Sequence, residues 1–481
     1  MQLKISYKNI KQFVILIVAL LPLQLTIRLI FNLPSFLMLI NIAIFLLVIF
    51  YCSQPAENKK LSSFKINIIY IYISLFLITL ISVLINYSEI IEYQSSQFAY
   101  YVMQYSKFWD SSAMSSIYSG IIRPAIYFIF FYTLIFILQK EQDLQNLYKI
   151  LLSIAIISCF YSIYQLFAYK YNLPFGSLCS GHSGMPITYL GLRRTEGIFY
   201  EGGPHATFLS FIFPLFIYQN FRNPLKRKRL YNIYLYLILI LLLLISFTTL
   251  SPIGILTPFI VFAILILQNW KRVKTHNKYI IAFSIMFVLL FSCNIQFGGT
   301  KGYNKYTIKN YIISRIDGDF NNSALAGDLR TTRNKITIDL IKKHPFIGIG
   351  AGNDGFYYAK YAPYAYGNMP TKNVIINNNL KIFADYVIIG FLLYLLLLIY
   401  PFYFFVKSKL YKYKTTFFLD KLINSLFVAE LLFVILTFQA QTEFLQPLFW
   451  IMYTMLISAI DIKRKRIKLL NAKGDFQHDN N

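Results

Sequence analysis

The chain has 481 residues, of which 57% are hydrophobic and only 14% are charged, and its formal net charge is +26. This apolar content exceeds what a soluble core needs, and it falls into segments of about 20 residues. A helix of that length crosses ~30 Å of hydrocarbon. The composition therefore excludes an ordinary soluble domain and predicts an integral membrane protein.

The apolar segments predict an all-α integral membrane fold with about twelve transmembrane helices, because a helix satisfies its own backbone hydrogen bonds in lipid. The first segment is followed at once by the second and lacks a cleavage signature, so an anchor is expected there. The predicted spans, in chain order, are 12–31, 33–51, 64–86, 120–138, 147–169, 203–219, 231–248, 252–269, 279–296, 383–405, 422–440 and 444–461.

Basic residues predict the orientation, because Lys and Arg in short loops resist translocation. With the N-terminus inside, the cytoplasmic segments hold 28 of the 46 Lys and Arg residues, with "NPLKRKRL" and "DIKRKRIKLL" as the strongest markers. Both termini are therefore predicted to be cytoplasmic, and 462–481 forms a basic tail. Much of the net charge is then a topology signal beside anionic headgroups. No recognisable nucleic-acid-binding fold accompanies it, so no nucleic-acid partner is expected.

The polar residues predict the division of the chain. Residues 1–296 carry nine spans with outer loops at 87–119 and 170–202, and 383–461 carry the last three spans. Between them, 297–382 is predicted to be one large extracytoplasmic loop containing short helices. Within it, Asp328 is a candidate N-cap of a helix running to about Lys343, which "HPFIGIG" ends because proline and repeated glycine cannot continue a helix.

Charge gathers in the second outer loop, in "RRTEGIFYEGGPHATF" from Arg193 to Phe208. A second arginine pair, Arg330 and Arg333, is three residues apart and shares one face of the loop helix. The guanidinium fork matches phosphate oxygens and stays charged under all conditions. Two such pairs at the outer leaflet suit a polyanionic headgroup such as a lipid pyrophosphate. The competing interpretation is that they bind ordinary anionic lipid or only solvate the loops.

Other motifs favour structural roles. "GIGAGN", Gly348 to Asn353, lacks the third glycine of a dinucleotide fingerprint and the Gly-Lys-Ser/Thr of a phosphate loop, and is predicted to be a turn. "DGD", Asp317 to Asp319, lacks the glycine that a calcium loop needs and is predicted to be a surface turn. The histidines at 182, 205 and 344 lack metal spacing, so no metal site is predicted.

Four stretches together resemble the O-antigen polymerase and O-antigen ligase superfamily of multispanning glycosyltransferases. "RTEGIFYEGGPHATF" is similar to the family's Arg-x-x-Gly-x-Phe segment, and "TLSPIGILTPFIVF" to its Ser-x-x-Gly span start. "LIKKHPFIGIGAGNDGF" is similar to the helix, Pro and Gly-x-Gly-x-Gly element of the large outer loop. "NNNLKIFADYVIIGFLLYL" is similar to the acid and glycine that lead into the next span. The likeness covers roughly 190–400, with the four stretches in the family's order.

The resemblance implies a reaction at the outer face of the bacterial inner membrane, in which a glycan leaves a polyprenyl pyrophosphate and joins an acceptor hydroxyl. The expected partners are polyprenyl-pyrophosphate-linked oligosaccharides as donor and acceptor, the lipid bilayer and a chain-length regulator protein. No cofactor is implied, since preorganised cations stabilise the departing pyrophosphate. The implied substrate-binding residues are Arg193, Arg194, Arg330, Arg333 and His344.

Two departures favour a polymerase over a ligase. Ligases resemble one another in a histidine about nine residues before the acid of the late span, and nine residues before Asp385 stands Ile376. The segment after the motif arginine reads "YEGG", with Glu201 where ligases usually carry Asn-Pro. A sugar hydroxyl as acceptor benefits from a general base. The candidate catalytic residues are Glu201, Glu196, His205 and Asp385, with Glu443 as a further acid near the outer end of the last span.

Three alternatives stay open. A ligase-like transferase acting on another acceptor shares the motifs. A flippase for the lipid-linked repeat would also bind pyrophosphate, but such proteins use internal repeats and charges within spans. An unrelated polyprenyl-dependent transferase with an acidic motif in the first outer loop fits worst, because that loop here is "NLPS", Asn32 to Ser35.

Overall fold

A computed structural model shows a helical protein, with one pair of two-residue strands in the part of the chain that it describes. That part comprises 7–31, 39–53, 60–94, 121–171, 173, 174, 176, 178, 188–189, 192–221, 229–249, 251–268, 326–346, 348–351, 353, 354, 357, 375, 377–413, 415–437 and 447–472.

The helices follow the predicted spans, and each predicted segment except 279–296, which lies outside the described residues, falls on a helix. Before the strands come α1 (Tyr7–Leu20), η1 (Leu21–Leu23), α2 (Gln24–Ile30), α3 (Leu39–Cys52), α4 (Ser63–Gln94), α7 (Arg123–Ile137) and α8 (Glu141–Tyr171). After them come α9 (Gly202–Phe221), α10 (Arg229–Thr248), α11 (Pro252–Gln268), α14 (Ala326–Lys343), α16 (Asn378–Lys407), η6 (Leu410–Lys412), α17 (Phe417–Leu432), η7 (Phe433–Thr437) and α19 (Pro447–Ala472).

Five of the described helical segments are long and apolar enough to cross a membrane: Lys11–Arg28, Ser63–Ser88, Glu141–Ala168, Leu230–Thr248 and Ile388–Lys407. Three shorter apolar helices, Leu39–Cys52, Arg123–Ile137 and Ile253–Leu265, accompany them. An integral membrane protein is therefore supported, while the number of twelve spans stays a prediction. In α16 the candidate span begins at Ile388, so Asp385 precedes it.

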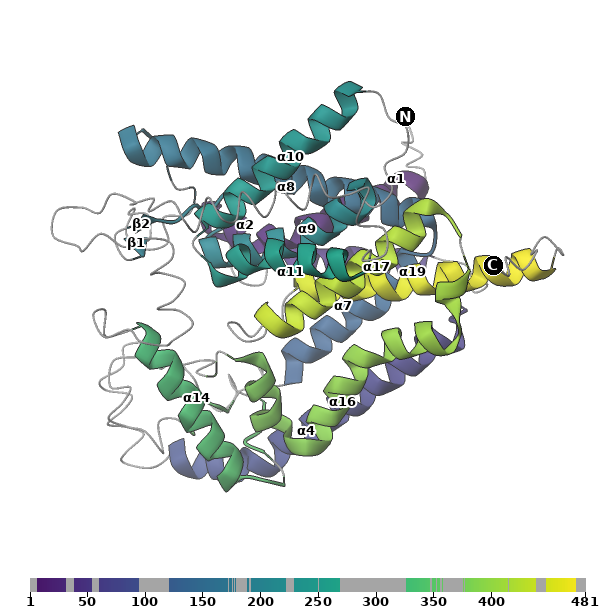
Figure 1. The fold of residues 1–481 in the computed structure, drawn as a ribbon. Coiled ribbons are helices and arrows are strands. Elements are labelled where there is room, and N and C mark those ends of the chain that lie inside the picture. The colour runs from purple at the N-terminus through teal and green to yellow at the C-terminus, as the bar shows by residue number, and fades with distance from the viewer. Residues whose placement is uncertain are drawn as a thin grey trace, which may run out of the picture.

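The two ends of the helical body differ in what they carry (Figure 1). The loop end, at the left of the figure, carries α14 and the strand pair, in which β1 (Thr188–Tyr189) runs antiparallel to β2 (Leu192–Arg193). The tail end, at the right, is where α19 leaves the body. Between them the core is apolar, and Trp450, Tyr453 and Tyr218 are among its largest fully buried side chains.

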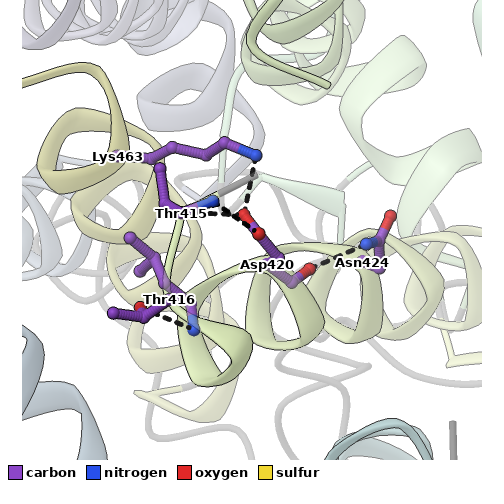
Figure 2. A network of polar contacts seen from close by, with 6 residues as sticks. Thr415, Thr416, Asp420, Asn424 and Lys463 are labelled. Atoms are coloured by element: carbon purple, nitrogen blue, oxygen red, sulfur yellow. Dashed lines mark hydrogen bonds and ion pairs between the residues drawn. The ribbon is translucent and has the colours of Figure 1, made fainter. Parts of the chain in front are cut away.

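Ion pairs fasten helices together at the tail end. Asp420, in the first turn of α17, accepts hydrogen bonds from Thr415 and receives the Lys463 ammonium of α19 at 2.7 Å (Figure 2). Thr416 caps the same helix by accepting from Leu419 N. Lys65 of α4 lies 3.4 Å from Asp461 of α19. These contacts join α19 to α17 and to α4, which lies far from it in the sequence.

The loop helix α14 begins at Ala326, two residues before Asp328. The expectation that Asp328 caps this helix is therefore wrong, because the residue lies inside the first turn. The predicted end is confirmed: His344 N donates to Leu340 O, and Gly348 follows with a positive φ of 73°.

Candidate functional site

The segment Arg193–His205 lies between the loop ends of several helices. Thr195 N donates to Thr248 O at 3.1 Å, and the hydroxyl oxygens of the same two residues lie 2.9 Å apart. Thr248 is the last residue of α10. The segment is therefore tied to the C-terminus of α10, whose last carbonyl groups have no partner within the helix.

Helix α8 holds the other side of the segment with two neutral side chains. Gln165 Oε1 accepts from Glu196 N at 3.0 Å and from Gly197 N at 2.9 Å, while Ser158 Oγ accepts from Ile198 N at 3.2 Å. Gly197 has a φ of 58°, and a Cβ there would stand 2.1 Å from Ser158 Oγ. Only glycine fits this turn, which explains why the motif needs one at that position.

Arg194 lies near the end of α10 and the start of α9, and the start of α11 is close by. The Nε of Arg194 donates to Thr249 O at 2.9 Å, just past α10, and its Nη1 is 3.8 Å from Glu201 Oε1. The first residue of α9, Gly202, lies beside Arg194: a Cβ atom added to this glycine would be 3.2 Å from Arg194 Nε. Helix α11 starts shortly after Thr249 in the chain. Its first turn packs closely on α9, since a Cβ atom added to Gly254 would be 3.3 Å from Ala206 Cβ.

This arrangement suits an anion. The N-termini of α9 and α11 carry the positive ends of two helix dipoles, and neither helix has an acidic residue in its first turn. Backbone N–H groups at such ends bind phosphate, and a guanidinium adds fixed charge and paired donors. Arg194 lies beside the start of α9 and donates to Thr249, against which Gly254 in the first turn of α11 packs, so an anion there would meet the guanidinium close to these helix starts.

The acids and the histidine of the segment differ in exposure. The Glu201 side chain is 40% exposed and faces the guanidinium, whereas Glu196 and His205 are buried. His205 Nε2 lies 2.9 Å from Ser158 Oγ, and its ring stacks on Phe199. Among the candidate bases in this segment, Glu201 has the greatest access to solvent, while His205 is enclosed beside the turn. Arg193 lies in β2, and its side chain is outside the described part, as is the backbone of Glu443.

Arg330 and Arg333 both lie in the helix α14, and their side chains are not among those described, so the shared face stays a prediction. At the end of α14, the His344 ring packs edge-on against Tyr357 with centroids 4.8 Å apart. Helix α14 packs against α16, so this loop element is joined to a membrane helix.

Helix α16 turns back on itself near its start. Tyr394 OH lies 3.2 Å from Asn378 Nδ2 and 3.1 Å from Asn379 Oδ1. Sixteen residues of straight helix would separate Asn378 from Tyr394 by about 24 Å, far beyond the reach of the two side chains. The segment Asn378–Asp385, which we call the in-turned segment, therefore lies alongside the span, and Figure 1 shows α16 changing direction near its start.

The glycine turn of the outer loop fills the bend in α16. Ile349 N donates to Ala384 O at 2.9 Å, Gly350 N donates to Asp385 O at 3.3 Å, and Ser82 Oγ of α4 donates to Asp385 O at 2.9 Å. A Cβ on Gly348 would lie 2.6 Å from both carbonyl oxygens. "GIGAGN" is thus a turn, as predicted, and it supplies donors to carbonyl groups at a broken helix.

Three buried charges hold this junction together. Lys381 Nζ lies 3.3 Å from Asp354 Oδ1 and 3.4 Å from Asp385 Oδ2. Burial, opposed by the Lys381 ammonium and reinforced by the Asp354 carboxylate, raises the pKa of Asp385 to about 7. Burial alone would lower the pKa of Lys381, but the two carboxylates outweigh it and raise that pKa. Two acids share one lysine here, so one acid is only partly compensated.

Sequence reasoning placed Asp385 at the site but missed its partners. Lys381 stands four residues before Asp385, a helical spacing that signals a pair, whereas Asp354 comes from a distant loop without such a signal. Glu430, buried in α17, was also missed, although an acid inside an apolar span is itself a functional signal. Among the described residues, no group of three or more His, Cys, Asp or Glu side chains is placed to hold a metal ion.

The comparison with protein families now bears on this geometry. Residues 234–395 match the family model described as O-antigen ligase. The match confirms the resemblance to the O-antigen polymerase and ligase superfamily, and it supports a polymerase-like or ligase-like function without separating the two. It runs from α10 through α11 and α14 to Tyr394 and Leu395 of α16, so it includes the bend and the glycine turn. No curated protein matches the chain.

Proposed function

We propose that this protein is a surface-polysaccharide polymerase of the O-antigen type. It transfers a growing glycan from polyprenyl pyrophosphate to a lipid-linked repeat unit at the outer face of the bacterial inner membrane, with both chain termini in the cytoplasm. The observation that carries the proposal is Arg194, fixed between the start of α9 and Thr249 at the end of α10, in a chain of which residues 234–395 match the O-antigen ligase family model.

In this reaction the pyrophosphate gains negative charge as the glycosidic bond breaks. Arg194 and the two helix N-termini would stabilise that charge, because groups already oriented in a partly buried site need no reorganisation during the reaction. The ion pair with Glu201 and the hydrogen bond to Thr249 O hold the guanidinium in place. Arg330 and Arg333 on α14 are the proposed second contact with the donor.

A polymerase is favoured over a ligase by two sequence features. Ile376 stands where ligases resemble one another in a histidine, and Glu201 follows the motif arginine in place of Asn-Pro. Glu201, Glu196, His205 and Asp385 stay candidate bases. The contacts above favour a positioning role for His205 and Asp385, which are enclosed, and for Glu201, which is ion-paired with Arg194.

The test is the surface glycolipid pattern of the native host after deletion of the gene, compared on a gel with the parent strain. The proposal expects a lipid core bearing a single repeat and no ladder of longer chains. A bare core would instead indicate a ligase-like transferase or a flippase, and accumulation of long lipid-linked polymer would then identify the ligase.

Replacing Arg194 or Arg333 with Ala tests the pyrophosphate contact directly. Loss of one oriented charge donor typically lowers a rate by about 100-fold or more, so the ladder should vanish or shorten while the protein stays in the membrane. Lys342, which is exposed on α14 and pairs with the exposed Asp339, provides the control through Lys342→Ala. Unchanged chain lengths in both arginine variants would refute the pyrophosphate contact.

A further inference from the structure

Glu430 is a carboxyl group in the apolar body of the protein, and none of the described lysines or arginines forms an ion pair with it. It is 6% exposed, and within the described part of the chain it forms no ion pair, while its Oε1 accepts no hydrogen bond. Three buried aspartates, Asp354, Asp385 and Asp461, each lie within 3.4 Å of a lysine ammonium. A buried acid without such compensation is costly, which makes a role in substrate chemistry the first hypothesis.

Helix pairing places Glu430 toward the loop end. Gln219 Nε2 donates to Phe418 O, and Lys421 Nζ donates to Gln219 O, both at 3.1 Å, so the end of α9 meets the start of α17. The two helices pack extensively and run antiparallel. Glu430 lies nine residues after Lys421 and twelve after Phe418, about 14 to 18 Å further along α17 at 1.5 Å per residue. The same distance back along α9 from Gln219 reaches residues 207–210, so Glu430 is level with these. That is within about two turns of Gly202, where Arg194 lies.

The neighbouring residues connect this level of α17 with α16. Phe427, three residues before Glu430, packs against Phe402 and Phe405 of α16, with ring centroids 5.4 and 5.6 Å apart. The Tyr453 hydroxyl of α19 donates to Leu397 O of α16. Tyr394 OH is the group that meets Asn378 and Asn379, brought there by the bend in α16. Polar segments that turn back to membrane depth are tolerated where they are buried in protein or line a hydrated cavity. Helix α17 also passes directly into the π-helix η7, a distortion frequent at functional sites.

We propose that Glu430 and the in-turned segment of α16 form the acceptor side of the site, where Glu430 binds the attacking sugar hydroxyl and acts as its general base. The inference rests on the proposed polymerase function. The hydroxyl oxygen bonds to the anomeric carbon of the donor glycan. The bond from that carbon to the pyrophosphate oxygen breaks and its electron pair leaves with pyrophosphate. The hydroxyl proton passes to the Glu430 carboxylate.

The experiment uses the full-length protein and lipid-linked single repeats extracted from the deletion host. Glu430→Gln keeps the size of the side chain but cannot accept the proton, so the polymerisation rate should fall at least 100-fold, within the range of general-base losses. The melting temperature and the stabilisation by added undecaprenyl pyrophosphate should stay at parental values. Ser425→Ala, which removes a buried hydroxyl bonded to Leu422 O on the same helix, is the matched control and should retain the parental rate.

The outcomes separate this inference from the proposed function. If Glu430→Gln polymerises within about threefold of the parent while Glu201→Gln does not, Glu201 is the base and the inference is overturned. If Glu430→Gln lowers the melting temperature and the rate together, Glu430→Asp, which keeps a carboxylate, decides: a rate well above that of Glu430→Gln supports the base, and a rate no higher than that of Glu430→Gln overturns it. If Arg194→Ala still responds to undecaprenyl pyrophosphate and makes parental ladders, the proposed pyrophosphate site fails whatever Glu430 does.

Discussion

The charged clusters at the two ends of the molecule differ in their ratio of lysines to carboxylates. At the tail end, Lys65 and Lys465 both face Asp461, so cations exceed acids around that carboxylate. At the loop end, Asp354 and Asp385 share Lys381, so acids exceed cations. The first arrangement suits a surface beside anionic headgroups. The second leaves a buried group whose protonation changes near neutral pH, as the raised pKa of Asp385 shows.

The ion pairs at the two ends also differ in how far solvent can reach the carboxylate. At the tail end Asp420, the partner of Lys463, is partly open to solvent and also accepts two hydrogen bonds from Thr415. At the loop end all three partners are buried and join a distant loop to the bend in α16. Removing Lys381 should therefore cost more than removing Lys463, because water can reach Asp420 but not the two loop-end carboxylates.

The largest expected effect follows Lys381→Ala. Removing the ammonium leaves two buried carboxylates beside each other, which costs about 3 to 5 kcal/mol of unfolding free energy. Denaturant unfolding of the purified protein in detergent measures the loss. Lys342→Ala, which breaks an exposed pair at the same end, should change the unfolding free energy by less than about 1 kcal/mol. Equal losses in both variants would contradict the buried role of Lys381.

Gly348→Ala should be the next most damaging change. The residue has a φ of 73°, and its new Cβ would lie 2.6 Å from the carbonyl oxygens of Ala384 and Asp385. Backbone strain of this kind costs on the order of 1 to 3 kcal/mol. The same unfolding measurement, with limited proteolysis of the outer loop, should show the turn released from α16. Parental stability and protection would mean that the turn does not depend on glycine.

The stability of the junction at the loop end should depend on pH through Asp385. The folded-state pKa of Asp385, about 7, lies above its ordinary value of 3.8. The corresponding stabilisation is therefore fully present below pH 3.8 and is lost as the pH rises through about 7. Lys381, whose pKa is raised above 10.5, does not titrate in this window. The melting temperature, measured between about pH 5 and 8, should fall as the pH rises. The Asp385→Asn variant should show a smaller change of melting temperature with pH. The same change in that variant would rule out Asp385 as its source.

Lys463→Ala at the tail end should have the smallest effect. Asp420 is partly exposed and retains its bonds from Thr415, so the loss should be about 1 kcal/mol or less, as for other solvent-accessible pairs. High salt should shrink the difference between this variant and the parent in melting temperature. A loss as large as that of Lys381→Ala would erase the distinction between the two clusters.

The sequence predicted the helical membrane class, the loop helix α14 and the glycine turn after it, because hydropathy, capping and helix-breaking residues act locally. It also identified Arg194 and Glu201, and these two residues meet in the structure. The cap at Asp328 was misplaced because helix boundaries depend on contacts beyond the capping residue. The "NNNLK" stretch was assigned to the outer loop, since a polar run before an apolar segment has the composition of a loop.

What only the tertiary structure decided is the bend in α16 and the groups that it collects. Tyr394 reaches Asn378 only because the helix folds back, and Lys381 meets Asp354 only because a loop returns from residue 354. Glu430 reaches the level of the arginine segment through the pairing of α9 with α17. Such neighbours are set by packing between distant segments, whereas hydropathy and spacing report only which residues follow one another in the chain.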